Sequence, residues 1–341
     1  MPALFDRLRR WLREDPPPLQ PAVERVNMQL ENAHAVLVGV GGDLANTVDD
    51  AQALHDILVD PERCGYLPAN VRLLTGSAAT APAIVAALDA VAQVANEQSS
   101  VIVYFSGHGL RSGLEDNAKY FLLASGYDLT RLAETAIGGG QFARRIAAIR
   151  SKKLLILLDC CHAGGLELQI GKTPLAKAPL PAAPEVLMAG SGRVLIASST
   201  ASEVSFAGKP YSLFTAALLQ SLSGVGTARQ DGYVRAADLA LHTRSTVEAA
   251  SRKRQHPTMW FDQADNFVVA YYAGGGLTPK AAPEGATASI ELEAPTETRD
   301  GGNATFNQNK WIVTGKVINT GVYNAAAGPG SRTSSDEQSD A

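Results

Sequence analysis

Two long apolar runs that each end in reactive side chains constrain the fold of this chain more than any other feature. Residues 99–109 (SSVIVYFSGHG) and 153–161 (KLLILLDCC) are apolar along most of their length, which is typical of strands covered on both faces in a parallel sheet. Further apolar runs lie at 34–40, 71–76, 193–199 and 266–272, and segments with helical spacing lie at 47–58, 82–96, 140–149, 211–222 and 236–250. This alternation predicts an α/β fold with a mostly parallel sheet of about six strands and helices on both faces.

The regions outside this alternation differ in composition. Residues 1–32 contain a run of three prolines and are expected to form a helical arm with a stiff spacer. We expect one folded domain over 33–273. Within it, 166–192 is rich in Pro, Ala and Lys without periodicity, which predicts an exposed, mobile loop. Residues 274–341 begin with three glycines and end in a polar run, so we expect a linker and a mostly flexible tail with a small β-like patch.

Composition excludes several classes of protein. Of 341 residues, 45% are hydrophobic and 19% are charged, with 30 Lys and Arg against 34 Asp and Glu, so the chain is globular and slightly acidic. This balance argues against a general nucleic-acid binder and against a protein that binds anionic membranes. The sequence shows no membrane span and no apolar signal region, and its three cysteines are too few for a disulfide framework. We therefore expect a cytoplasmic protein with reduced thiols.

Reactive residues follow two of the predicted strands. One strand ends in Ser106-Gly107-His108-Gly109 and the other in Asp159-Cys160-Cys161-His162. Because the carboxyl ends of parallel strands meet at one edge, neighbouring strands would bring an imidazole beside a thiol. An imidazole can take the proton of a thiol and return a proton to a leaving amine. The backbone N–H groups of Gly109 and Cys161 are candidates for the oxyanion hole.

Other assignments of these residues are open. Adjacent side chains on a strand point to opposite faces, which favours packing for Cys160 and chemistry for Cys161, although the register at a strand end is the weak point. The same alternation disfavours His162 as the base. Cys64 lies beside Gly65 in a predicted loop and has no assigned role. Adjacent cysteines without a CxxC partner fit a tetrahedral zinc site poorly, and a Gly-rich turn after the first strand lacks the full dinucleotide-binding pattern.

The two reactive motifs resemble a known family. YFSGHG and LLILLDCCHAGG resemble the histidine and cysteine boxes of the caspase and metacaspase clan, most closely the bacterial metacaspase or orthocaspase type of peptidase family C14. Three later segments (ASSTASEVSFAGKPYSLFTAALLQSL, DGYVRAADLALHTRSTVE and HPTMWFDQADNFVVAYY) resemble its small-subunit region, so the resemblance covers roughly 33–272. It implies a caspase-like three-layer sandwich and a regulated cysteine endopeptidase with His108 as base and Cys161 as nucleophile. The spacing of the pair, 161 − 108 = 53, is close to the ~50 residues of caspases.

The resemblance also implies a substrate. Metacaspases line the pocket for the residue before the scissile bond (P1) with an acid of the first loop, the serine of the SGHG box and the acid of the cysteine box. These are Asp50, Ser106 and Asp159 here. Carboxylates match a guanidinium, so Arg, then Lys, is the expected P1 residue. In another interpretation Asp50 completes a helix cap with Thr47, where the family commonly has a cysteine, and Asp159 only orients backbone.

The remaining predictions concern regulation. The resemblance implies no required cofactor, with calcium as a candidate at Glu115, Asp116 and Asp128, although their pattern does not match the family's. Self-cleavage is predicted after Lys172 or Lys177. Partners are protein or peptide substrates, and 286–341 is a candidate contact for a regulatory partner. The resemblance alone suggests a bacterial stress, defence or death pathway. The alternatives are a catalytically silent caspase-like scaffold, or a peptidase of the clan with another P1 preference.

Overall fold

A computed structural model describes most of the chain between its ends. The described residues are 29–113, 118–161, 167–170, 173–177, 188, 191–200, 203, 205–206, 208–262 and 264–286, with backbone alone at 161, 167–170 and 173–177. The strands are β1 (Ala33–Gly39), β2 (Val71–Thr75), β3 (Ser100–Ser112), β4 (Lys119–Leu122), β5 (Ile137–Gly138), β6 (Lys153–Cys161), β7 (Glu167–Ile170), β8 (Thr173–Lys177), β9 (Arg193–Ala197), β10 (Tyr233–Arg235), β11 (Thr258–Asp262) and β12 (Val268–Tyr271). The helices are α2 (Asn46–Val59), α3 (Ala81–Val94), α4 (Leu132–Thr135), α5 (Gly139–Ala148), α7 (Leu213–Leu222) and α8 (Ala236–Ala250), with 3₁₀ turns η1 (Pro68–Asn70), η2 (Gly76–Ala78) and η4 (Leu129–Arg131).

Six strands form the central sheet in the order β11-β9-β6-β3-β1-β2. All neighbours pair parallel except β11, which runs antiparallel to β9 at one edge. The predicted α/β fold with a mostly parallel sheet of about six strands is therefore confirmed. Each parallel step needs a crossover that passes over a sheet face, and the helices supply these crossovers.

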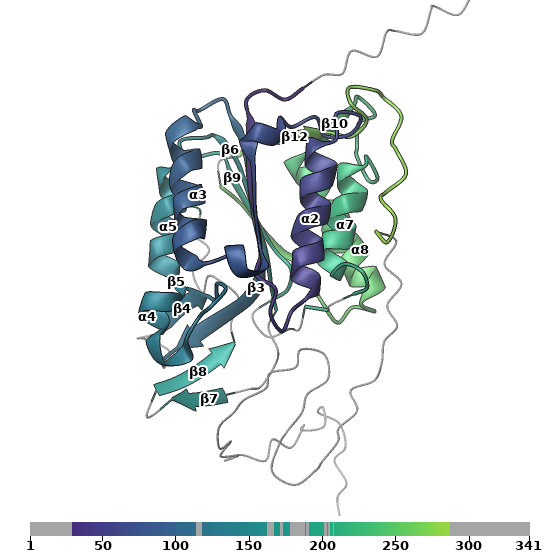
Figure 1. Ribbon diagram of the computed structural model, residues 1–341. Coiled ribbons are helices and arrows are strands. Elements are labelled where there is room, and N and C mark those ends of the chain that lie inside the picture. Colours follow the sequence, from purple (N-terminus) through teal and green to yellow (C-terminus); the bar gives the residue numbers. More distant parts are fainter. Residues whose placement is uncertain are drawn as a thin grey trace, which may run out of the picture.

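Helices cover both faces of the sheet, so the domain has three layers (Figure 1). Helices α2, α7 and α8 lie on one face, and α3 and α5 lie on the other. Strand β6 shows how one sequence serves both faces. Its Leu155 and Leu157 belong to the core under α2, α7 and α8, whereas Leu154, Ile156 and Leu158 belong to the core under α3 and α5. Burial of each such side chain contributes about 1.5–3 kcal/mol, which explains a strand with no polar residue over this stretch.

Strand β3 continues beyond the central sheet, and four short strands extend the sheet at its end. Strand β4 pairs with β3 and β5, and β8 pairs with β3 and β7, all antiparallel. The loop predicted over 166–192 is wrong for its first part, because β7 and β8 form a hairpin there. Pairing with a distant strand gives this segment an order that its local composition does not indicate.

Two predictions near the end of the domain are also corrected. The run 266–272 does not close the central sheet, because β12 pairs with β10 in a separate two-stranded sheet and β11 is the edge strand. Residues 274–286 are not a free linker. Lys280 forms an ion pair with Glu62, and the Ala286 carbonyl accepts a hydrogen bond from the Gln220 side chain at 2.7 Å. Within the described residues, every helix is too short or too polar to cross a lipid bilayer.

Candidate active site

The register of β3 and β6 brings the two reactive motifs together at the carboxyl edge of the sheet. Ser106 pairs with Asp159, Gly107 with Cys160, and His108 with Cys161. Parallel neighbours in register have their Cα atoms about 4.8 Å apart, so the backbones of residues 108 and 161 are adjacent. The expectation that these two strands are neighbours is thus confirmed at the level of backbone. The side chain of residue 161 lies outside the described atoms.

The other two cysteines are buried. Cys160 is 2% exposed and packs in the core under α3 and α5, as strand alternation predicts for the residue before Cys161. Cys64 is fully buried rather than in an open loop, and burial raises the pKa of its thiol well above the ordinary range. Both side chains therefore lie in the core, where a cysteine packs as a small hydrophobic residue.

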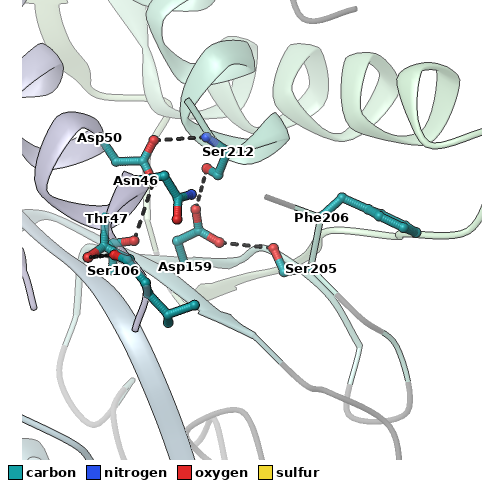
Figure 2. Close-up of a pocket in the computed structure, with 9 residues that line it drawn as sticks. Asn46, Thr47, Asp50, Ser106, Asp159, Ser205, Phe206 and Ser212 are labelled. Carbon is teal, nitrogen blue, oxygen red and sulfur yellow. Dashed lines mark hydrogen bonds between the residues drawn. The ribbon is translucent and has the colours of Figure 1, made fainter. Parts of the chain in front are cut away.

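An acidic pocket lies on the α2 and α7 side of the same edge (Figure 2). The three residues predicted for substrate binding, Asp50, Ser106 and Asp159, all line it, each at most 3% exposed. They come from α2, β3 and β6. Its other lining residues are Leu44, Asn46, Thr47, Ser205, Phe206 and Ser212.

Serine side chains and one backbone N–H satisfy the two carboxylates of this pocket (Figure 2). The Ser212 N–H donates to Asp50 Oδ1 at 2.9 Å, and the Ser212 hydroxyl donates to Asp159 Oδ2 at 2.5 Å. The Ser205 hydroxyl donates to the other Asp159 oxygen at 3.0 Å, and the Ser106 hydroxyl makes a long contact of 3.5 Å with Asp50. Ser205 and Ser212 had no predicted role, because they lie about fifty residues along the chain from Asp159 and only the fold brings them to it.

Burial makes these two carboxylates hard to ionise. Loss of hydration raises the pKa of Asp50 well above its usual range, and the nearby charge of Asp159 raises it further. Burial also raises the pKa of Asp159, while hydrogen bonds from Ser212 and Ser205 act in the opposite direction. Two carboxylates in one dry site repel each other, so the pocket favours a cation that would neutralise both.

The loop before α2 is built differently from its prediction. Thr47 and Asp50 form no capping box, because the first helical turn has no side-chain cap. The Thr47 hydroxyl accepts a hydrogen bond from the Gly41 N–H at 2.7 Å and donates to the Leu44 carbonyl at 2.8 Å. Gly41 and Gly42 both have φ near +73°, a conformation that favours glycine. Thr47 therefore closes a tight turn that carries residue 43.

A contact that the sequence analysis missed joins this turn to the predicted base. Asp43 Oδ2 lies 2.9 Å from His108 Nε2, with the histidine side chain 3% exposed and the carboxylate 27% exposed. Asp43 had no predicted role. Its contact with His108 depends on a turn geometry that a residue pattern does not reveal.

The backbone of β3 directs Gly109 toward the edge shared with β6. The Val40 N–H donates to the Ser106 carbonyl, and the Leu123 N–H donates to the His108 carbonyl. Successive residues of a strand direct their backbone polar groups to opposite edges, so Gly109 directs its N–H to the edge along which β6 runs as far as Cys161. This direction is the one that an oxyanion donor beside residue 161 needs.

The wall of the pocket that carries Ser205 is held by a polar network. The buried Gln255 side chain accepts a hydrogen bond from the Phe206 N–H at 2.9 Å and donates to the Ser205 hydroxyl at 3.1 Å. Nearby, Glu203 accepts bonds from both the backbone N–H and the ring of His256, at 2.8 and 2.6 Å. These contacts tie the segment before α7 to the chain that leads into β11.

Of the predicted calcium and processing residues, the structure describes Asp128 and Lys177, and neither lines the acidic pocket. The Asp128 carboxylate accepts bonds from Thr130 and Arg131, which lower its pKa to about 2, so its oxygens already have partners in a local cap. No group of three His, Cys, Asp or Glu side chains suited to a metal occurs in the described part of the chain. Lys177 is the last residue of β8, opposite Leu110 of β3. Glu115, Asp116, His162 and Lys172 lie outside the described residues.

Comparison with known proteins gives one family match. The family model described as a caspase domain (Peptidase_C14) matches residues 32–268, well over half of the chain. A crystal structure of a protein from Geobacter sulfurreducens is similar over 72% of this chain and 99% of that chain, with 13% identity and a TM-score of 0.47. No curated protein sequence matches the chain.

Proposed function

The chain belongs to the caspase-domain family of cysteine peptidases, and from this premise we propose that it is an endopeptidase that cleaves proteins after arginine or lysine. His108 is the proposed base and Cys161 the proposed nucleophile. One observation carries the proposal. Residues 108 and 161 are paired on neighbouring strands, and a pocket with two buried carboxylates lies at the same edge of the sheet. A nucleophile motif and a cation-binding pocket at one sheet edge are what such a peptidase needs.

The proposed reaction begins with transfer of the Cys161 proton to the imidazole of His108. The thiolate sulfur then forms a bond to the carbonyl carbon of the P1 residue, and the backbone N–H groups of Gly109 and Cys161 stabilise the oxyanion. The C–N bond breaks as the imidazole returns the proton to the amine. Water hydrolyses the thioester, with the imidazole as general base, and the free thiol is restored. No cofactor takes part in any of these steps.

The acidic pocket supports the P1 preference. A guanidinium placed between Asp50 and Asp159 would replace the hydroxyl and N–H donors with charge-assisted bonds and remove the repulsion between the carboxylates. An aspartate at P1 would add a third negative charge at the same place. The pocket chemistry therefore favours Arg over Asp, and it favours Arg over Lys because a planar guanidinium can bond both carboxylates.

A fluorogenic peptide assay tests the proposal. Matched substrates that differ only at P1, with Arg, Lys, citrulline or Asp, are given to the wild type and to Cys161→Ala, with and without calcium. We expect cleavage of the Arg and Lys substrates by the wild type alone. Absence of cleavage from every substrate would favour a catalytically silent scaffold, and preference for the Asp substrate would contradict the pocket assignment.

Self-cleavage is proposed at Lys172 rather than Lys177. Lys177 belongs to a strand with partners on both sides, and a peptide in such a ladder must leave it to enter an active site. Lys172 follows the last residue of β7 by two positions. Intact mass of the wild type beside Cys161→Ala, Lys172→Gln and Lys177→Gln tests this. We expect the new fragment to be absent in Cys161→Ala and Lys172→Gln, and its survival in Lys172→Gln would reject the site.

We also propose a cytoplasmic location, where reduced thiols suit a cysteine nucleophile. Residues 286–341 remain the proposed contact for a regulatory partner, and all of them except Ala286 lie outside the described residues.

A further inference from the structure

We propose that Asp43 is a positioning residue that holds the His108 imidazole by its Nε2, so that Nδ1 is the atom that accepts the Cys161 proton. The inference rests on the proposed function and adds a third member to the pair. It begins from the contact of 2.9 Å between Asp43 Oδ2 and His108 Nε2.

The chemistry of a carboxylate assigns the histidine tautomer. A carboxylate has only acceptor lone pairs, so the hydrogen of this bond belongs to Nε2 of the imidazole. In a neutral ring the lone pair is then on Nδ1. When Nδ1 takes the thiol proton, the ring becomes cationic while its Nε2–H still faces Asp43. The carboxylate therefore both selects the reactive nitrogen and stabilises the charge that forms on proton transfer.

The turn that carries Asp43 is held on both sides. Gly41 and Leu44 form a β-bridge across it, and the Thr47 hydroxyl bonds to both of these residues. The ring of His108 is buried, so its orientation is restricted by packing as well as by this bond. A carboxylate fixed by its backbone against a buried ring is suited to orienting that ring before substrate arrives.

The surroundings of Asp43 are consistent with a charged group directed at the imidazole. Burial, together with the nearby Asp43 charge, raises the pKa of Tyr127 to about 12. Tyr127 is therefore a neutral phenol at physiological pH and contributes no competing charge. The neighbouring acids Asp49 and Asp50 belong to α2, and Asp50 is directed to Ser212 in the acidic pocket instead.

Three variants test the role. Asp43→Asn keeps the size of the side chain but lets its amide donate to the ring, which would favour the other tautomer. Asp43→Glu keeps the carboxylate, and Asp49→Asn removes an exposed neighbouring charge as the matched control. We expect Asp43→Asn to lower kcat about 10²-fold, with KM within about twofold. Loss of the corresponding buried carboxylate in a serine-protease triad costs ~10⁴, and the expected loss is smaller here because Asp43 is partly exposed. Asp43→Glu should recover part of this loss, and Asp49→Asn should behave as the wild type.

A second readout does not need peptidase activity. The rate of Cys161 alkylation by iodoacetamide at neutral pH follows the fraction of thiolate, and peptide mass spectrometry separates Cys161 from the buried Cys64 and Cys160. We expect slower alkylation of Cys161 in Asp43→Asn by several-fold, with unchanged thermal stability. Should the wild type cleave no peptide, the proposed function fails, but this rate still tests the Asp43 contact. Equal or faster alkylation and kcat in Asp43→Asn would overturn the inference.

Discussion

Asp43 and Asp50 are only seven residues apart in the sequence and lie at the same edge of the sheet, yet their surroundings differ in exposure and in hydrogen-bond partners. Asp43 is partly exposed and bonds to an imidazole, so its charge has both water and a basic partner. Asp50 is fully buried and shares its pocket with Asp159, where the partners are hydroxyl and N–H groups. The first carboxylate has a partner for its charge, whereas burial makes ionisation of the second pair unfavourable.

In the proposed mechanism, this difference separates a group that assists the reaction from groups that select the substrate. A partly exposed carboxylate beside a base costs little to maintain and can assist proton transfer. Two buried carboxylates are costly to folding, and a site that retains them has a use for their charge. The comparison therefore predicts that changes at Asp43 affect the chemical step, whereas changes at Asp159 and Asp50 affect which peptide is cut.

Substitution of Asp159 should cause the greatest loss of activity toward the Arg substrate. Asp159→Asn leaves one neutral amide where the P1 guanidinium needs a charge. Removing one partner of a buried charge pair costs ~2–5 kcal/mol, so kcat/KM for the Arg substrate should fall about 10²- to 10³-fold. Alkylation of Cys161 should be unchanged. A parallel loss of alkylation would mean that Asp159 acts on the nucleophile rather than on the substrate.

A smaller effect is expected at Ser212, which serves both the pocket and a helix. Its hydroxyl donates to Asp159 and accepts the Thr215 N–H at the start of α7. Ser212→Ala should lower stability by about 1–3 kcal/mol through the lost cap and the unsatisfied carboxylate, and should lower kcat/KM for Arg substrates about tenfold. Ser205→Ala, which removes one bond to Asp159 without a cap, is the comparison variant. Thermal unfolding that drops equally in both variants would contradict the dual role.

The smallest effect is a dependence of stability on pH. The pKa of Asp50 is raised on folding, so the folded protein binds this proton more tightly than the unfolded chain. Stability due to this group therefore rises as pH falls through the raised pKa and levels off near the unfolded value of ~4. Asp50→Asn removes the cost of the charge, so its Tm should exceed that of the wild type by a few degrees at pH 8.

This gain should disappear as the pH approaches 4, where both proteins carry a neutral group at position 50. Asp49→Asn, an exposed change beside it, should show no gain at either pH. A Tm for Asp50→Asn below that of the wild type at pH 8 would mean that the carboxylate stabilises the empty pocket, which contradicts the account of the buried pair.

The central helices and strands could be predicted because the pattern of apolar residues in each matches the surfaces that it buries. Strand β6 has the predicted limits, 153–161, and helix α8 has the predicted limits, 236–250. Edge elements were harder. Strand β11 is short and its Phe261 is 43% exposed, so it lacks the apolar run of a buried strand. The pairing of β8 with β3 comes from a distant partner, and periodicity carries no such information.

The position of some residues at this edge could be predicted from the sequence, and that of others could not. Ser106 and Asp159 lie at the ends of buried strands, so alternation and topology indicate their common edge. Asp43 lies in a turn whose path depends on two glycines with positive φ and on the Thr47 hydroxyl. Ser212 comes from a helix start far along the chain. Residues placed by loops and long-range packing cannot be assigned from spacing alone.

Covalent labelling with a peptide acyloxymethyl ketone that carries Arg at P1 tests the proposed nucleophile and the proposed pocket together. Thiolate attack expels the carboxylate leaving group and forms a thioether, whose position is mapped by peptide mass spectrometry. We predict one adduct per chain on Cys161, strongly reduced in His108→Ala and Asp159→Asn and absent with the Asp analogue. An adduct on another residue, or equal labelling by the Arg and Asp reagents, would contradict the account.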